Sequence, residues 1–171
     1  AQADTGAQLA GLVGHGAGGK TTLAEAMLHR TGTIATPGSV EKGTTVADFD
    51  PLEKTYQHSL NSSLLHFSHL DTHIHLIDTP GYPNFMGPAI SALDAVETVA
   101  VVINAQNGIE LTTHRMMTLA QKRHLCRMII INKIDAEIHG LFPMELEAPK
   151  GKVIAAKPAA KKAAEKKKGK K

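Results

Sequence analysis

The stretch GHGAGGKT, Gly14–Thr21, decides the fold of this 171-residue chain. It matches the pattern G-x-x-x-x-G-K-[ST], and it follows an apolar run at 9–14 that is typical of a buried strand. The segment 21–32 after it has the apolar spacing of a helix. A glycine-rich turn between a strand and a helix directs backbone N–H groups and the positive end of the helix dipole toward a phosphate. The stretch therefore predicts a phosphate-binding loop; the alternative is a glycine-rich turn with a chance Lys-Thr.

The rest of the body alternates apolar runs with helical patterns. We expect two strands joined at Asp71–Thr72, two further strands, two further helices and one long loop. The expected strands are 60–70, 73–78, 98–104 and 125–132, the expected helices lie within 88–97 and 111–124, and the loop is 33–58. Strands separated by helices predict an α/β fold of the P-loop NTPase class, with a doubly wound, mostly parallel sheet.

The second motif is DTPG, Asp78–Gly81, which directly follows the apolar run HIHLI. A carboxylate at the end of a strand can hold Mg²⁺ through water, and the Gly81 N–H can meet a γ-phosphate. Asp-x-x-Gly is also ordinary turn chemistry. Its position after a phosphate loop favours the nucleotide interpretation, in which Lys20 reaches the β- and γ-phosphates and the Thr21 hydroxyl ligates Mg²⁺.

The third motif is NKID, Asn132–Asp135, at the end of the strand predicted at 125–132. The Asp135 carboxylate can accept both N–H groups on one edge of guanine, and adenine has no such pair of donors. Asn132 can contact the other edge of the base and brace the phosphate loop, while the Lys133 stem can pack on the ring. Since ligands of open α/β sheets bind at the carboxyl ends of the strands, the three motifs together predict a guanine-nucleotide site.

The segments GHGAGGKTTLAEAMLHRTG, DTPGYPNF, SALDAVETVAVVINAQNGIELTTHRMM and NKIDAE closely resemble the GTP-binding domain, or G domain, of elongation factor G. The resemblance covers roughly residues 9–138, and the elongation-factor-G-like branch shares VEKG, DFDP and DTPGY. It implies a ribosome-dependent GTPase of translation that uses Mg²⁺ and binds GTP and GDP. Aligning DFDPLEKTYQHSL with the family's first mobile loop places Ser59 where relatives carry a Thr that ligates Mg²⁺; the alternative is a solvated Ser at the start of a strand.

The motifs and the resemblance together define the predicted site. The predicted nucleotide-binding residues are Gly14, His15, Gly16, Ala17, Gly18, Gly19, Lys20, Thr21, Thr22, Asp78, Thr79, Pro80, Gly81, Asn132, Lys133 and Asp135. The predicted metal ligands are Thr21, Ser59 and Asp78, and the predicted catalytic residues are Lys20, Gly81 and Tyr82.

The sequence departs from the family in three places. Tyr82 stands where most translational GTPases have a His that positions the attacking water; a phenol is not a base at neutral pH, although it can orient water by hydrogen bonding. The phosphate loop reads GAGG where relatives more often read SGAG. Its length is preserved, so we expect the loop still to bind phosphate, with greater flexibility. After Asp135 we find neither the family's next strand nor its Ser-Ala loop, and we therefore expect an incomplete G domain without the family's later domains.

Charge divides the chain into two parts. Residues 151–171 carry nine Lys and one Glu, whereas residues 1–150 carry ten Lys and Arg against fifteen Asp and Glu. We therefore expect an incomplete G domain at 1–140, followed by a linker and a disordered basic tail at 141–171 that either binds ribosomal RNA or only adds solubility. One Cys, no long apolar run and no visible secretory signal predict a cytoplasmic protein, or an organellar one, without a membrane partner.

Four histidines, His66, His69, His73 and His75, cluster in HFSHLDTHIH. We interpret them as outward residues of an exposed hairpin, with a zinc site as the alternative. For the whole chain two functions stay open. One is a GTPase activated by the ribosome, and the other is a catalytically weak GTPase-like protein that binds ribosome or RNA, which Tyr82 favours.

Overall fold

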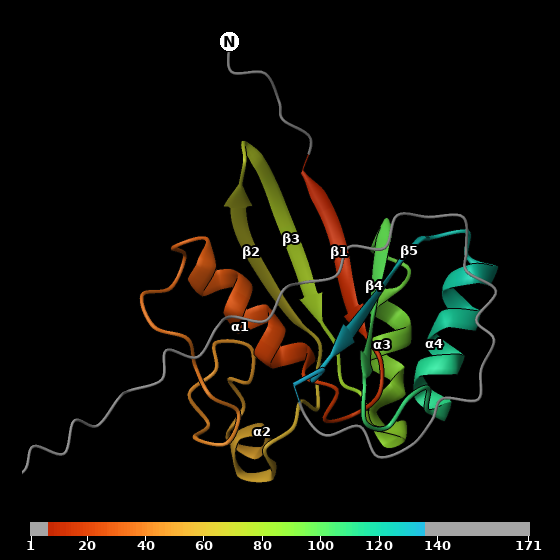
Figure 1. Ribbon diagram of the computed structural model, residues 1–171, viewed down its shortest axis with the longest axis horizontal. Coiled ribbons are helices and arrows are strands. Elements are labelled where there is room, and N and C mark those ends of the chain that lie inside the picture. The colour runs from red at the N-terminus through yellow and green to blue at the C-terminus, as the bar shows by residue number, and fades with distance from the viewer. Residues whose placement is uncertain (1–6, 136–171) are drawn as a thin grey trace, which may run out of the picture.

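The computed structural model describes residues 7–135 as an α/β domain built on one five-stranded sheet (Figure 1). In chain order its elements are β1 Gln8–Val13, α1 Lys20–Arg30, α2 Pro51–Tyr56, β2 Ser63–His69, β3 Thr72–Asp78, the 3₁₀ turn η1 Pro83–Phe85, α3 Met86–Ala92, β4 Thr98–Asn104, α4 Leu111–Lys122 and β5 Cys126–Asn132. All five strands expected from the sequence are present. The predicted boundaries at 140 and 141, and the tail, lie outside the described residues.

The strand order β2-β3-β1-β4-β5 confirms the doubly wound, mostly parallel sheet. β1 pairs in parallel with β3 and β4, and β4 pairs in parallel with β5. Only β2 runs antiparallel, in a hairpin whose register sets Ser63 opposite Asp78 and His69 opposite Thr72. This topology brings the carboxyl ends of β1, β3, β4 and β5 to one edge of the sheet, where the three motifs begin.

Two hydrophobic cores lie on opposite faces of the sheet. One packs α3 and α4 on the sheet through residues such as Leu93, Met116 and Val101. The other packs α1 on the sheet through residues such as Leu28, Leu76 and Val102. Consecutive residues of the interior strand β4 therefore pack into alternate cores, which explains its unbroken apolar run (Figure 1).

Two elements differ from the expectation. The loop predicted at 33–58 contains α2, which begins with a capping box: Asp50 accepts from Leu52, Glu53 accepts from the Asp50 N–H, and Pro51 takes the first helical position. The helix predicted within 88–97 is instead Met86–Ala92, because the three residues after it bond to carbonyls three positions back, in a tighter turn.

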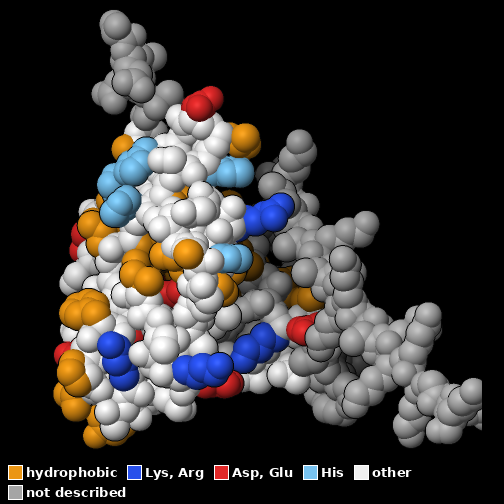
Figure 2. Space-filling view, turned by 90° about the vertical axis from the view of Figure 1, so that its left-hand side faces the viewer, with side chains coloured by type: hydrophobic (Ala, Val, Ile, Leu, Met, Phe, Trp, Pro, Cys, Tyr) orange, Lys and Arg blue, Asp and Glu red, His pale blue; other side chains and the backbone are white. Residues whose placement is uncertain are grey.

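In the histidine-rich hairpin His66 and His69 are exposed and His73 and His75 are half-buried, and histidine side chains gather on this face of the molecule (Figure 2). His66 lies opposite His75, and His73 and His75 pack edge to face with ring centroids 4.7 Å apart. Within residues 7–135 no group of three or more His, Cys, Asp or Glu side chains is placed to hold a metal ion, so the zinc alternative finds no support there. In the same range no helix is long and apolar enough to cross a membrane.

Candidate functional site

A cavity opens at the carboxyl edge of the sheet, around the N-terminus of α1. Its lining combines the phosphate loop, the start of DTPGY and the loop that carries α2, residues 33–62, which we call the α2 loop. The lining residues are Gly16, Ala17, Gly19, Lys20, Thr21, Thr22, Val40, Glu41, Asp48, Gln57, His58, Ser59, Thr79, Gly81, Tyr82 and Lys133. Most of the predicted phosphate-binding residues thus meet around one space.

Lys20 is the first residue of α1, and its side chain is buried. The Nζ atom donates to the carbonyl oxygens of Gly14, at 3.2 Å, and His15, at 2.9 Å. Burial lowers the pKa of Lys20, and the nearby carboxylate of Asp78 raises it in part. The loop carbonyls and the carboxylate therefore hold this ammonium group at the floor of the cavity.

Gly81 brings the DTPG motif against the phosphate loop. The Gly16 N–H donates to the Gly81 carbonyl at 3.0 Å. A Cβ atom at Gly81 would collide with Lys20 Nζ and with the backbone of His15 and Gly16. Only glycine allows this close approach, which places the two motifs side by side.

The three predicted metal ligands also converge. The Thr21 hydroxyl donates to Asp78 Oδ2 at 2.6 Å, and it lies 3.3 Å from the Ser59 hydroxyl, where either oxygen can donate. Asp78 ends β3, and Ser59 belongs to the α2 loop, so residues from three separate segments meet at one point. Ser59 is half-buried and donates to Asp48, and its role as a metal ligand remains a prediction.

The surroundings of the buried Asp78 carboxylate favour a cation beside it. Its other oxygen, Oδ1, is buried without a hydrogen-bond partner among the described residues. Burial raises the pKa of Asp78 from 3.8 to about 6, against the opposing effects of the Thr21 hydrogen bond, of Lys20 and of the Thr79 backbone N–H, while Asp48 adds to the rise. A cluster of carboxylate and hydroxyl oxygens suits a hard cation such as Mg²⁺. Thr21, Ser59 and Asp78 therefore fit the metal that the sequence predicts.

Asp48 is a member of this cluster that the sequence analysis missed. It is buried, and it accepts hydrogen bonds from the hydroxyl groups of Ser59, at 2.7 Å, and Thr45, at 3.0 Å. It orients the Ser59 hydroxyl and brings a second carboxylate close to the predicted metal ligands. The only signal in the sequence was its place in DFDP, within a loop of the length that is usually functional.

Two buried glutamates hold the α2 loop in place. Glu25 of α1 accepts from the backbone N–H groups of Gly38, at 2.8 Å, and Val46, at 2.5 Å. Glu53 of α2 accepts from the backbone of Asp50, Leu60 and Asn61, at 3.2, 2.9 and 3.0 Å. These bonds satisfy partly buried backbone donors and fix the segment that presents Asp48 and Ser59.

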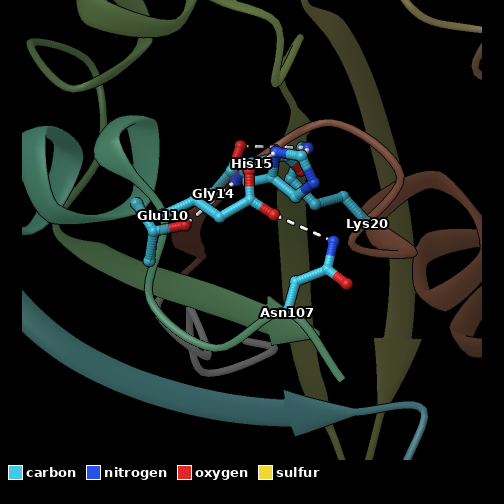
Figure 3. A network of polar contacts seen from close by, with 6 residues as sticks. Gly14, His15, Lys20, Asn107 and Glu110 are labelled. Atoms are coloured by element: carbon cyan, nitrogen blue, oxygen red, sulfur yellow. Dashed lines mark hydrogen bonds and ion pairs between the residues drawn. The ribbon is translucent and has the colours of Figure 1, made fainter. Parts of the chain in front are cut away.

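His15 connects the phosphate loop to α4 (Figure 3). Its Nδ1 lies 2.7 Å from a carboxylate oxygen of Glu110, the N-cap residue of α4, and Asn107 donates to the other oxygen of that carboxylate. The His15 N–H donates to the Thr113 hydroxyl at 3.2 Å. Burial lowers the pKa of His15, Glu110 opposes that shift, and Lys20 and Lys133 add to it. The contacts with Glu110 and Thr113 connect the loop to α4.

The NKID motif reaches the phosphate loop from β5. The Asn132 side-chain amide donates to the Gly18 carbonyl at 3.0 Å, which is the bracing contact that we expected. Lys133 lines the cavity, whereas Asn132 and Asp135 lie outside its lining, and Asp135 is exposed. The guanine-binding roles of these residues remain predictions.

The remaining predicted residues take supporting positions. Thr79 donates from its hydroxyl to the Leu12 carbonyl at 2.7 Å, which joins β3 to β1, and Pro80 is buried beside it. Tyr82 is 38% exposed at the rim of the cavity. Gly14 and Gly18 shape the loop without lining the space.

The fold and the three converging motifs define a GTP-binding domain of the translational GTPase class, and family comparison agrees. The family model described as the elongation factor Tu GTP binding domain matches residues 7–166. The chain belongs to this family.

Its relatives include an elongation factor G-like protein and tetracycline resistance proteins. The chain is 34% identical over 143 residues to the tetracycline resistance protein TetO of Streptococcus pneumoniae, and 36% identical over 124 residues to the elongation factor G-like protein of Mycobacterium tuberculosis. These matches cover 84% and 72% of this chain but 22% and 17% of those proteins. A crystal structure of a protein from Thermus thermophilus superimposes with a TM-score of 0.71 and 35% identity, over 72% of this chain and 19% of that one. The chain thus spans about a fifth of the length of these relatives.

Proposed function

We propose that this chain binds GTP and GDP with Mg²⁺ and hydrolyses GTP to GDP and phosphate in connection with the ribosome. One observation carries the proposal: a buried carboxylate oxygen of Asp78 without a partner among the described residues lies in a cluster with the Thr21 and Ser59 hydroxyls, beside Lys20. That arrangement suits a divalent cation next to a phosphate chain. The relatives named for elongation factor G and for tetracycline resistance support the link to translation.

In this proposal each segment of the site has a separate task. Phosphate-loop N–H groups and the α1 dipole surround the phosphates, and Lys20 stabilises charge on the bridging and terminal oxygens. Bound Mg²⁺, held by Thr21, Ser59 and, through water, Asp78, supplies further charge neutralisation. The Gly81 N–H meets the γ-phosphate while water attacks in line, and the Tyr82 ring lies beside the approach of that water.

Base recognition rests on the NKID segment. Asp135 accepts from the guanine N1 and N2 donors, and the Lys133 stem packs on the ring. The contact from Asn132 to Gly18 supports this role, because it holds the base-binding segment at a fixed distance from the phosphate loop.

A second candidate is a GTPase-like binding protein with little turnover, which Tyr82 favours. Phosphate release from bound GTP, measured with and without ribosomes, separates the two. Ribosome-stimulated release that disappears in Lys20→Ala supports the GTPase. Tight GTP binding with no release under either condition selects the binding protein.

The domain limits and the basic tail belong to the proposal as well. We propose a G domain at 1–140 and a tail at 141–171 that binds ribosomal RNA through its lysines, in a protein of the cytoplasm or an organelle. The test measures the affinity for ribosomes as a function of salt concentration, for the full chain and for the chain without residues 151–171. A shallower salt dependence after deletion supports RNA binding by the tail, and an unchanged one rejects it.

A further inference from the structure

His58 is a cavity residue that neither the motifs nor the proposed mechanism uses. It immediately precedes Ser59 and lines the same cavity as Lys20 and Gly81. Its ring packs against Tyr82 with centroids 4.7 Å apart and an interplanar angle of 58°. The imidazole therefore lies beside Tyr82, which stands where most relatives have a His that positions the attacking water.

The hydrogen bonding of His58 fixes its tautomer. Nδ1 lies 2.9 Å from the backbone carbonyl oxygen of Tyr56. A carbonyl oxygen only accepts, so in the neutral ring Nδ1 carries the proton and Nε2 carries a lone pair. Among residues 7–135 Nε2 has no hydrogen-bond partner. A neutral imidazole with one nitrogen held and the other free to accept is the form that general bases use.

The backbone and the neighbouring rings hold His58 in place. Its N–H donates to the Glu53 carbonyl at 3.3 Å, and the Glu53 carboxylate accepts from the backbone just beyond it. On the other side, Tyr82 lies over Gly16, where a Cβ atom would come within 2.8 Å of the ring. The side chain thus lies between Tyr56, Tyr82 and Phe85 rather than in open solvent.

We propose that His58 accepts the proton of the attacking water, and that Tyr82 holds the imidazole in position. The inference rests on the proposed GTPase function. The water oxygen forms a bond to the γ-phosphorus, and the bond from that phosphorus to the β–γ bridging oxygen breaks. The electron pair stays on the β-phosphate of GDP, the water proton passes to Nε2, and it leaves to solvent after phosphate departs. This division of roles accounts for a tyrosine at position 82, since the base comes from the α2 loop.

The test uses the full chain in excess over GTP, with Mg²⁺, and measures single-turnover phosphate release with ribosomes. The affinity for a fluorescent GTP analogue is measured separately. His58→Ala should lower the rate by about 100-fold or more, as for loss of a general base. The affinity should stay within about threefold, because His58 is not a ligand of the nucleotide. Added imidazole should restore part of the rate, and His58→Gln, which can orient water, should retain more than His58→Ala. The control is His69→Ala on the exposed hairpin, which should match the wild type.

Three outcomes would overturn the inference. A His58→Ala rate within about threefold of the wild type removes the catalytic role while leaving the proposed GTPase intact. A parallel loss of GTP affinity and rate, without rescue by imidazole, makes His58 a structural residue. A wild-type chain that binds GTP and releases no phosphate under any condition refutes the proposed hydrolysis. That result also refutes the role of His58 as a general base.

Discussion

Replacing Asp78 with Asn should stabilise the metal-free protein and at the same time abolish its response to Mg²⁺. The carboxyl is buried, one oxygen has no partner among the described residues, and burial raises its pKa from 3.8 to about 6. At neutral pH the folded protein therefore holds an unfavourable buried charge that water solvates in the unfolded chain. Asn removes the charge and keeps an oxygen to accept the bond from Thr21.

The size of the effect follows from the pKa. A rise of about two units, at about 1.4 kcal/mol each, sets an upper limit of about 3 kcal/mol on the gain in unfolding free energy. The Asn amide would also lack a partner, so we expect a net gain of about 1–3 kcal/mol. For a chain of this size each kcal/mol raises the melting temperature by about 2–4 °C.

The sign of the pH dependence is also fixed. Because the pKa is raised in the folded state, folded Asp78 retains its proton between about pH 4 and 6 while the unfolded chain loses it. The contribution of this group to stability therefore falls as pH rises through that window. The difference in unfolding free energy between Asp78→Asn and the wild type should be small near pH 4 and largest above pH 6.

The assay is urea and thermal unfolding of both proteins in EDTA across this pH range, and again with Mg²⁺ and GDP. Mg²⁺ with GDP should raise the melting temperature of the wild type and leave Asp78→Asn nearly unchanged. Asp71→Asn, in the exposed hairpin turn, is the control for a carboxylate lost from the surface. The reasoning is refuted if Asp78→Asn is less stable than the wild type in EDTA at about pH 7.5, or if the difference does not vary with pH.

Other predictions concern the residues around this cluster. Asp48→Asn should weaken Mg²⁺ binding by about 10-fold, because Asp48 orients the Ser59 hydroxyl, and titration with Mg²⁺ at fixed GDP measures it. Glu53→Ala leaves three backbone N–H groups without their acceptor and should lower the free energy of unfolding by about 3 kcal/mol. Proteolysis of the α2 loop should become faster, and Glu53→Gln should cost less. Tyr82→Phe should slow phosphate release by less than about threefold, since the ring rather than the hydroxyl packs on His58, and a larger loss would give the hydroxyl a direct role.

Local patterns were enough to predict the sheet and most of the phosphate site. The apolar runs that became β1, β4 and β5 have the composition of buried parallel strands, and the glycine-rich turn before Lys20 has a specific sequence pattern. The alignment with relatives placed Ser59 beside Thr21, although the two residues lie 38 positions apart. These features depend on short segments or on an alignment, and both are readable from the sequence.

The roles of Asp48 and His58 could not be predicted in the same way. Both lie in the α2 loop, whose backbone is bound by Glu25 from α1 and by Glu53 from within the loop. Asp50 and Glu53 do form a readable capping-box signal, so α2 was predictable in principle. How the loop then turns back onto β3 depends on contacts between distant residues, and no local pattern specifies them.

The central claim, a Mg²⁺-dependent site for guanine nucleotides, is tested most directly by equilibrium competition. Bound fluorescent GDP is displaced with GTP, GDP or ATP, in Mg²⁺ and in EDTA, with Lys20→Ala as the control for the phosphate site. We predict that GTP and GDP compete at least about 100-fold better than ATP, because only guanine offers Asp135 its pair of donors. We also predict that Lys20→Ala and EDTA each weaken binding strongly. Equal competition by ATP, or full binding in Lys20→Ala, would contradict the account.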